Sequence, residues 1–138
     1  MNNNCFLCAF FKNKDNALFL HSDEFVTAIL SKTPINSGHA IVFPNKHFIS
    51  FSAIDFETLG KMFYLASRIG TAAKRALDSE GYNIIASEGS VAGQDIQHSY
   101  LNIIPRFLND GFHLNWRMLN IDDKHEEIAN KIISKLKI

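Results

Sequence analysis

The sequence predicts an α+β fold in which helices cover an antiparallel β-sheet. Two β-rich segments, residues 25–30 and 39–44, precede a long stretch of helical periodicity at residues 56–78, and two more follow at residues 81–86 and 98–106. The strands within each pair are joined by short turns, and the long helix lies between the pairs. This order favours an antiparallel sheet with helices packed against it over a parallel βαβ array.

Length and charge indicate a single domain, residues 1–138. A chain of 138 residues buries roughly two thirds of its unfolded surface in one core. Its 14 basic and 14 acidic residues balance, so no overall field draws it to nucleic acid or to a membrane, and neither is an expected partner. The apolar residues 5–11 are too short for a signal-peptide core or a membrane span, which predicts a cytoplasmic protein.

Residues 25–30 and 39–44 are predicted to form a hairpin. The first segment is rich in β-forming residues, and Pro34 and Gly38 mark the turn after it. His39 then opens the second strand, where the expected role is that of a hydrogen-bonded core residue.

A long amphipathic helix is predicted next. Ser52 and Asp55 are candidate N-terminal caps, and the helix is expected to run to about Asp78, before Gly81. Apolar residues recur at the spacing of one helical face, namely Phe56, Leu59, Met62, Phe63, Ala66 and Ile69.

The last predicted strand carries the most informative residues. A turn through Gly89 and Gly93 leads into it. Because alternate side chains of a strand share a face, His98, Tyr100 and Asn102 are expected on one surface.

The C-terminal residues predict one more helix. It is amphipathic and is expected from Asp122 or Asp123 to about Leu136. Trp116, which precedes it, is expected to take part in core packing.

Cys5 and Cys8 are the only cysteines. Two thiols three residues apart, with no export signal, indicate metal ligands or reduced thiols rather than a disulfide framework. With His47 and His98 they would complete a closed Cys2His2 zinc site. The alternative is a pair of buried free thiols.

Five ordered motifs carry a family resemblance. They are Cys5-x-x-Cys8, Gly38-His39, the Pro44-Asn45-Lys46-His47 run, Gly81-x-Asn83, and the stretch from Ala92-Gly93-Gln94 to Pro105-Arg106. Over about residues 3 to 115 the chain resembles the histidine triad (HIT) family of nucleotide hydrolases and transferases. The resemblance implies a five-stranded antiparallel sheet with one long helix and a C-terminal helix, usually in a homodimer.

The resemblance also implies a chemistry. Active members bind a purine nucleotide by its α-phosphate, and the middle histidine of the triad attacks the phosphorus to form a covalent intermediate. The first histidine orients the nucleophile and the third contacts phosphate oxygens. A subset of the family binds structural zinc at the positions that match Cys5, Cys8, His47 and His98.

The triad positions of this chain depart from that pattern. Tyr100 stands where the nucleophile is expected, and a phenol with a pKa of about 10 is almost entirely protonated near neutral pH without a base. Asn102 cannot act as a base, and His98, the remaining candidate, is unavailable if zinc holds it. Tyr100 is either a poorly activated nucleophile or a residue that fills the pocket.

Other departures fall around the same pocket. Ser31 aligns with the acidic residue that binds ribose, Ser87 with an asparagine on the phosphate side, and Asp95 with a small hydroxyl residue. A carboxylate at that last position would repel phosphate unless it points away or binds a cation. The amides of Gly89, Gly93 and Gln94, with Asn102, are candidate phosphate ligands. The alternative is a glycine-rich hairpin turn that binds no ligand.

These residues predict a HIT-like nucleotide-binding, hydrolase-like protein with weak or lost nucleotidyl hydrolase activity. The expected partner is a purine nucleotide or a similar anion, and the expected cofactor is structural zinc. The alternatives are an active dinucleoside polyphosphate or nucleoside phosphoramidate hydrolase, and a structural or interaction protein whose pocket Tyr100 blocks.

Overall fold

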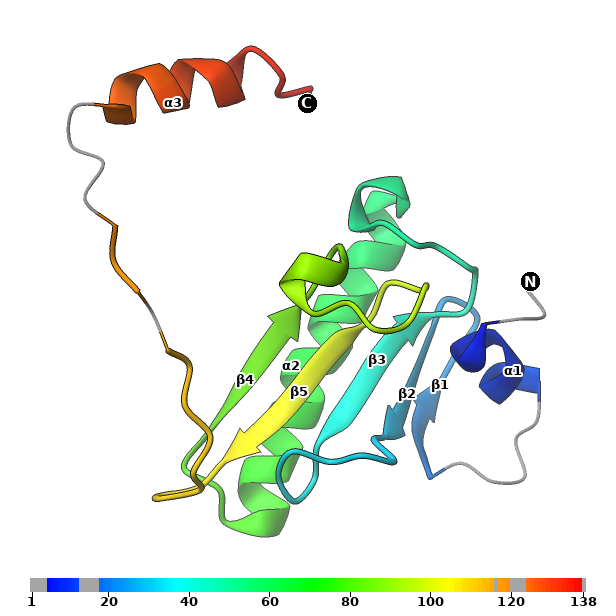
Figure 1. Cartoon of the computed structure of the whole chain (residues 1–138). Helices are drawn as coiled ribbons and strands as arrows, with labels where there is room; N and C mark the ends of the chain where they lie inside the picture. The colour runs from blue at the N-terminus through cyan, green and yellow to red at the C-terminus, as the bar shows by residue number, and fades with distance from the viewer. Residues whose placement is uncertain (1–4, 13–17, 116, 120–123, 138) are drawn as a thin grey trace.

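The computed structural model describes residues 5–12, 18–115, 117–119 and 124–137, and within them a five-stranded antiparallel sheet forms the centre of the molecule (Figure 1). The strand order is β1-β2-β3-β5-β4. The predicted α+β fold is confirmed. The strands are β1 Phe19–Ser22, β2 Val26–Leu30, β3 Ala40–Pro44, β4 Gly81–Ala86 and β5 Leu101–Arg106.

The predicted long helix is α2, Phe56–Leu77. Its N-cap is Asp55, whose carboxylate accepts a hydrogen bond from the Thr58 amide at 2.9 Å, so one of the two candidate caps is confirmed. Ser52 lies instead in a short 3-10 helix, η2 Phe51–Ala53. The helix ends at Asp78, which adopts the left-handed conformation with φ 54°.

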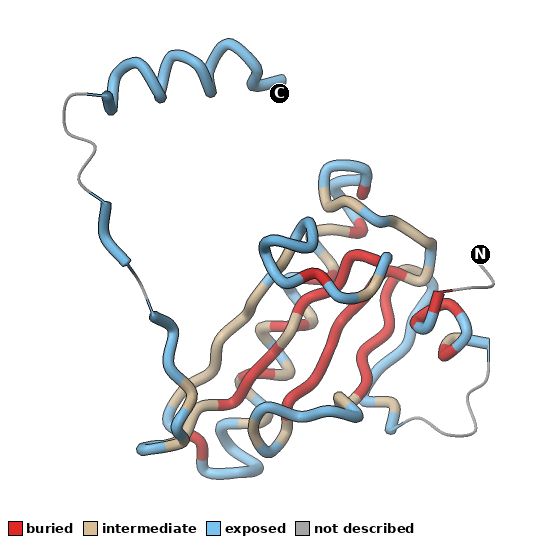
Figure 2. Tube along the Cα trace, viewed as in Figure 1, coloured by how far each residue is buried: buried red, intermediate tan, exposed pale blue. Residues whose placement is uncertain are grey.

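One face of the sheet packs against α2 (Figure 1). The buried residues of this main core come from three strands and the helix, and Figure 2 shows the central strands almost wholly buried. They are Val26, Ala28, Ala40, Val42, Met62, Ala66, Leu101 and Ile103, with Ile54 at the rim. The alternation predicted for the last strand is confirmed there, because Leu101 and Ile103 face α2.

The other face of the sheet is covered in part by α1, Phe6–Lys12. Its residues Leu7, Cys8 and Phe10 form a second core with Ile29, Ile41, Phe43 and Tyr100 from the sheet side. The sequence patterns did not predict α1, because seven residues without a polar face show no helical periodicity. They did not predict β1 either, since its residues are mostly exposed.

Strand β5 is shorter than predicted and begins at Leu101. The β3–β5 ladder ends at the Val42–Leu101 pair. Before it, the Ser99 amide bonds to the Phe48 carbonyl at 2.6 Å instead of to a strand, because the chain bends here toward the loop after β3. His98 and Tyr100 therefore precede β5 and Asn102 lies within it.

The C-terminal helix is α3, His125–Ile133, which Figure 1 shows apart from the sheet. The predicted helix is confirmed, but its predicted start at Asp122 or Asp123, like the packing role of Trp116, lies outside the described residues. Among the helices of the described chain, none combines the length and apolar character needed to cross a membrane.

Candidate functional site

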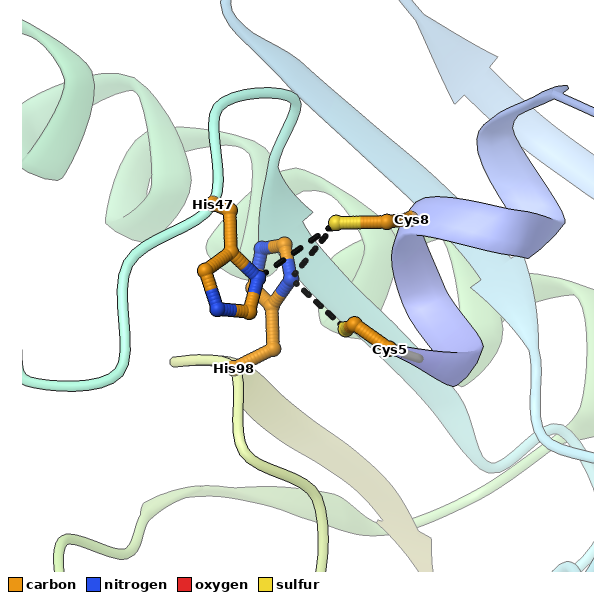
Figure 3. Close-up of side chains that lie close together, drawn as sticks. All are labelled: Cys5, Cys8, His47 and His98. Carbon is orange, nitrogen blue, oxygen red and sulfur yellow. Dashed lines mark hydrogen bonds between the residues drawn. The ribbon is translucent and has the colours of Figure 1, made fainter. Parts of the chain in front are cut away.

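Four metal-ligating side chains meet between α1 and the sheet (Figure 3). Cys5 precedes α1, Cys8 lies in its first turn, His47 follows β3 and His98 precedes β5. Residues three apart share one side of a helical turn, so both thiols point the same way. The four ligand atoms all lie within 4.8 Å of one another.

Their separations fit a tetrahedral zinc ion. The Cys5 Sγ lies 3.4 Å from His98 Nδ1, and the Cys8 Sγ lies 3.4 Å from His47 Nδ1 and 3.7 Å from His98 Nδ1. With Zn–S bonds of about 2.3 Å and Zn–N bonds of about 2.0 Å, a tetrahedron places S and N about 3.5 Å apart. The residues present therefore suit zinc in both type and spacing.

His98 is prepared to act as a neutral ligand. Its Nε2–H donates to the Pro44 carbonyl at 2.9 Å, which leaves Nδ1 and its lone pair directed at the thiols. Burial, with a smaller effect of neighbouring His47, lowers the pKa of His98 to about 4, against the opposing effect of the bond to Pro44. A neutral imidazole is the form that binds a metal.

Beside this cluster lies a cavity of about 540 Å³. Its walls come from the end of β2 and the residues after it, the start of β3, the loop before β5, and α1. Of the residues predicted to bind nucleotide or phosphate, Ser31, Gly93 and Asn102 line it, together with Tyr100. Its other polar side chains are Lys32, Thr33, His39 and Asp95.

At this cavity, Tyr100 is hydrogen-bonded to Asp95. The tyrosine is 8% exposed, and its hydroxyl donates to Asp95 Oδ1 at 2.5 Å. Burial first, then the hydrogen bond and the charge of Asp95, raise the pKa of Tyr100 to about 12, although Asn102 acts in the opposite direction. The phenol is thus held in its protonated form.

His39 joins the site through Asn102, a role that sequence reasoning missed. Its Nδ1 accepts a hydrogen bond from the Ile35 amide at 3.2 Å, so Nε2 carries the proton and donates to Asn102 Oδ1 at 2.9 Å. This bond fixes the amide orientation of Asn102, so that its NH2 group donates toward the Tyr100 oxygen and keeps a second hydrogen. The signal was present in the Gly38-His39 motif, and the expected hydrogen-bonded core position of His39 is confirmed at 5% exposure.

The predicted glycine turn is a loop held by side-chain hydrogen bonds of Gln94. Gly89 and Gly93, with φ of 85° and 91°, flank the 3-10 helix η3, Ser90–Ala92. The Gln94 side chain accepts from the Gly89 amide at 2.8 Å and donates to the Ile49 carbonyl at 3.0 Å. Ser87, Gly89 and Gln94 lie outside the lining of the cavity, as far as the described residues define it.

Comparison with known proteins identifies the family. The HIT domain family matches residues 12–109. An uncharacterized 16.1 kDa HIT-like protein of Mycoplasma pneumoniae is 30% identical over 120 residues, which cover 86% of this chain and 83% of the relative.

Solved structures agree with this match. A HIT family protein from Bacillus anthracis has a TM-score of 0.89 at 26% identity and covers 99% of this chain and 100% of its own. A Zn-bound histidine triad family protein from Mycobacterium smegmatis has a TM-score of 0.72 at 27% identity and covers 96% of this chain and 94% of its own. The chain therefore belongs to the HIT family.

Proposed function

We propose that this protein is a nucleotide-binding, hydrolase-like member of the HIT family with weak or absent nucleotidyl hydrolase activity. The observation that carries the proposal is the bond from the Tyr100 hydroxyl to Asp95. The side chain at the nucleophile position is a protonated phenol whose hydrogen is already donated. The cavity that Tyr100 lines, of about 540 Å³, is large enough for a ligand. This combination favours binding without turnover.

No strong base serves Tyr100 among the described groups around it. His98 is directed at the thiols and at Pro44, and the Nε2 of His39 is a donor. Asp95 accepts the hydrogen bond, but the ordinary pKa values of a phenol and a carboxylic acid differ by about 6 units, so proton transfer to it is strongly uphill. The raised pKa of Tyr100 widens that gap.

We further propose that Cys5, Cys8, His47 and His98 hold a zinc ion. Bound zinc would supply structure rather than catalysis, because four protein ligands leave no open position for water or substrate. The support is the fit of the donor set, which joins α1 to the loops that precede α2 and β5. Holding His98 in this way removes it as a base for Tyr100.

A homodimer is the proposed assembly, in the cytoplasm. The outward face of α2 exposes three aromatic residues at helical spacing, Phe56 at 92%, Phe63 at 45% and Tyr64 at 70%. Strand β4 forms one edge of the sheet. An apolar helix face and an open strand edge are both surfaces that a second copy can cover.

Two assays test the function. Purified full-length protein is incubated with adenosine phosphoramidate and with diadenosine tetraphosphate, and calorimetry follows titration with AMP and GMP. We expect binding without turnover. Turnover that disappears in Tyr100→Phe would instead identify an active hydrolase that uses the tyrosine, and turnover that persists in that variant would identify attack by water. Absence of binding at millimolar ligand would leave a structural or interaction protein.

A further inference from the structure

Four polar side chains form one wall of the cavity, and they are hydrogen-bonded to one another. Tyr100 donates its hydroxyl hydrogen to Asp95, and His39 donates its ring hydrogen to Asn102. Neither hydrogen is available to an incoming anion. One hydrogen of the Asn102 NH2 group is directed at the Tyr100 oxygen. The second hydrogen of this group is the donor that the described side chains of this wall still offer.

Asp95 gives this wall an acceptor and a negative charge. One carboxylate oxygen accepts from Tyr100 at 2.5 Å. The carboxylate keeps lone pairs for further donors, and Asp95 is exposed and lines the cavity. An ionised phosphate offers only acceptors and repels a carboxylate, whereas a sugar hydroxyl donates to it in a charge-assisted hydrogen bond.

Among the described residues of the lining, the one lysine is already in contact with two aromatic rings. Lys32 is the cation of the lining, and its ammonium lies over the rings of Phe10 at 4.8 Å and Phe6 at 5.9 Å from the centroids. A cation–π contact of this kind holds the charge at the aromatic side of the cavity. The rest of the lining is largely aliphatic, including Ile29, Ile35 and Ile41.

We propose that the cavity recognises the uncharged nucleoside part of a purine compound, with ribose hydroxyls donating to Asp95, and that Asp95 discriminates against a phosphate at this wall. The inference rests on the proposed ligand class and narrows it. The planar base packs among the aliphatic side chains, and Asn102 offers its remaining amide hydrogen to the ligand. Asp95 is thereby the residue that determines specificity.

Calorimetry on the full-length, zinc-loaded protein tests this selectivity. The probes are adenosine, 2′,3′-dideoxyadenosine and AMP, at one salt concentration because charge effects depend on it. In the wild type we expect adenosine to bind about tenfold more tightly than either AMP or the dideoxy compound. In Asp95→Asn the preference over AMP should shrink about tenfold, because the repulsion is gone and the diol loses its charged acceptor.

Matched variants separate this effect from a general loss of charge or of fold. Asp78→Asn makes the same chemical change in the left-handed cap of α2, outside the cavity lining, and should leave all three affinities unchanged. If Asp95→Asn does not fold, Asp95→Ser removes the charge and keeps a hydroxyl, and thermal melting verifies either variant.

The outcomes distinguish the two proposals. AMP binding more tightly than adenosine in the wild type would overturn this inference and leave the proposed ligand class standing. An unchanged ratio in Asp95→Asn would also overturn it. Absence of binding by all three probes would overturn the proposed function itself, and this inference with it.

Discussion

The four-residue cluster and the cavity lie only two residues apart along the segment that leads into β5, yet they differ in what their side chains are free to do. In the cluster, His98 is neutral and its free nitrogen faces two thiols at ligand spacing. In the cavity, Tyr100 is protonated and hydrogen-bonded to Asp95. One site is prepared to receive a metal ion, whereas the other has its polar groups satisfied internally.

The difference shows what each kind of site demands. A structural metal site needs the right donor atoms at the right separations, and burial helps it by keeping imidazole neutral. Covalent catalysis needs a nucleophile whose proton can leave, and burial beside a carboxylate works against a phenol. The same buried environment therefore favours the metal site and opposes reaction at Tyr100.

The largest expected effect comes from breaking the cluster. Cys8→Ser removes a thiolate ligand, and zinc content measured after purification without chelator should fall from one ion per chain to near zero. Stability should fall by about 4 kcal/mol, the linkage expected when free zinc exceeds its Kd about a thousandfold. Urea unfolding with and without added zinc measures this loss.

His21→Ala is the control for that experiment, because His21 is exposed and lies outside the cluster. This variant should keep its zinc and its stability within about 0.5 kcal/mol. Wild-type protein with zinc content far below one per chain would contradict the metal assignment.

Restoring imidazole to the cavity should have the next largest effect. In Tyr100→His combined with Asn102→His, hydrolysis of adenosine phosphoramidate should rise at least about a hundredfold, because an unprotonated imidazole is available near neutral pH. Single substitutions serve as controls. A double variant that folds and stays inactive would show that Ser31, Ser87 or Asp95 also limits the reaction.

Acid should weaken the fold through His98. Its pKa is lowered from 6.5 to about 4 in the folded protein, so only the unfolded chain takes up this proton between those values. The contribution is therefore complete above pH 6.5 and is lost as the pH falls toward 4, by about 2 kcal/mol after solvent screening is allowed for. Urea unfolding of chelator-treated protein at pH 7, 6 and 5 measures it, and His98→Gln should flatten the dependence.

The smallest effect is expected from Tyr100→Phe. Loss of one hydroxyl leaves Asp95 without its donor and should cost about 1 kcal/mol. The difference in absorbance titration between wild type and variant isolates the Tyr100 phenolate, which should appear near pH 12 instead of the usual 10.0. Because the folded pKa is raised, this contribution to stability is complete below pH 10 and is lost above it. A phenolate that forms below pH 9 would reveal an activated tyrosine.

The long helix, the central hairpin and the grouping of Cys5, Cys8, His47 and His98 into one cluster could all be predicted from the sequence. A 22-residue periodic stretch with an Asp cap is a strong local signal, and the cluster follows from residue type and motif. In contrast, α1 is held by contacts with the sheet rather than by its own pattern, and β1 is too exposed to show alternation.

The bonds inside the cavity could not be predicted, for a related reason. Asp95 follows the loop that the hydrogen bond between Gly89 and Gln94 closes, and the path of this loop brings Asp95 to Tyr100. The Gln94 side chain, a candidate phosphate ligand by sequence, is hydrogen-bonded to Gly89 and to Ile49. Side-chain partners of this kind depend on tertiary structure and leave no periodic trace in the sequence.

The central claim, that Tyr100 does not act as the nucleophile of a nucleotidyl transfer, has one direct test. Zinc-loaded protein is incubated with adenosine phosphoramidate, quenched and examined by intact-protein and peptide mass spectrometry, with Tyr100→Phe in parallel. We predict unmodified protein in both samples. A covalent adenylyl adduct mapped to Tyr100 in the wild type, and absent from the variant, would contradict the account.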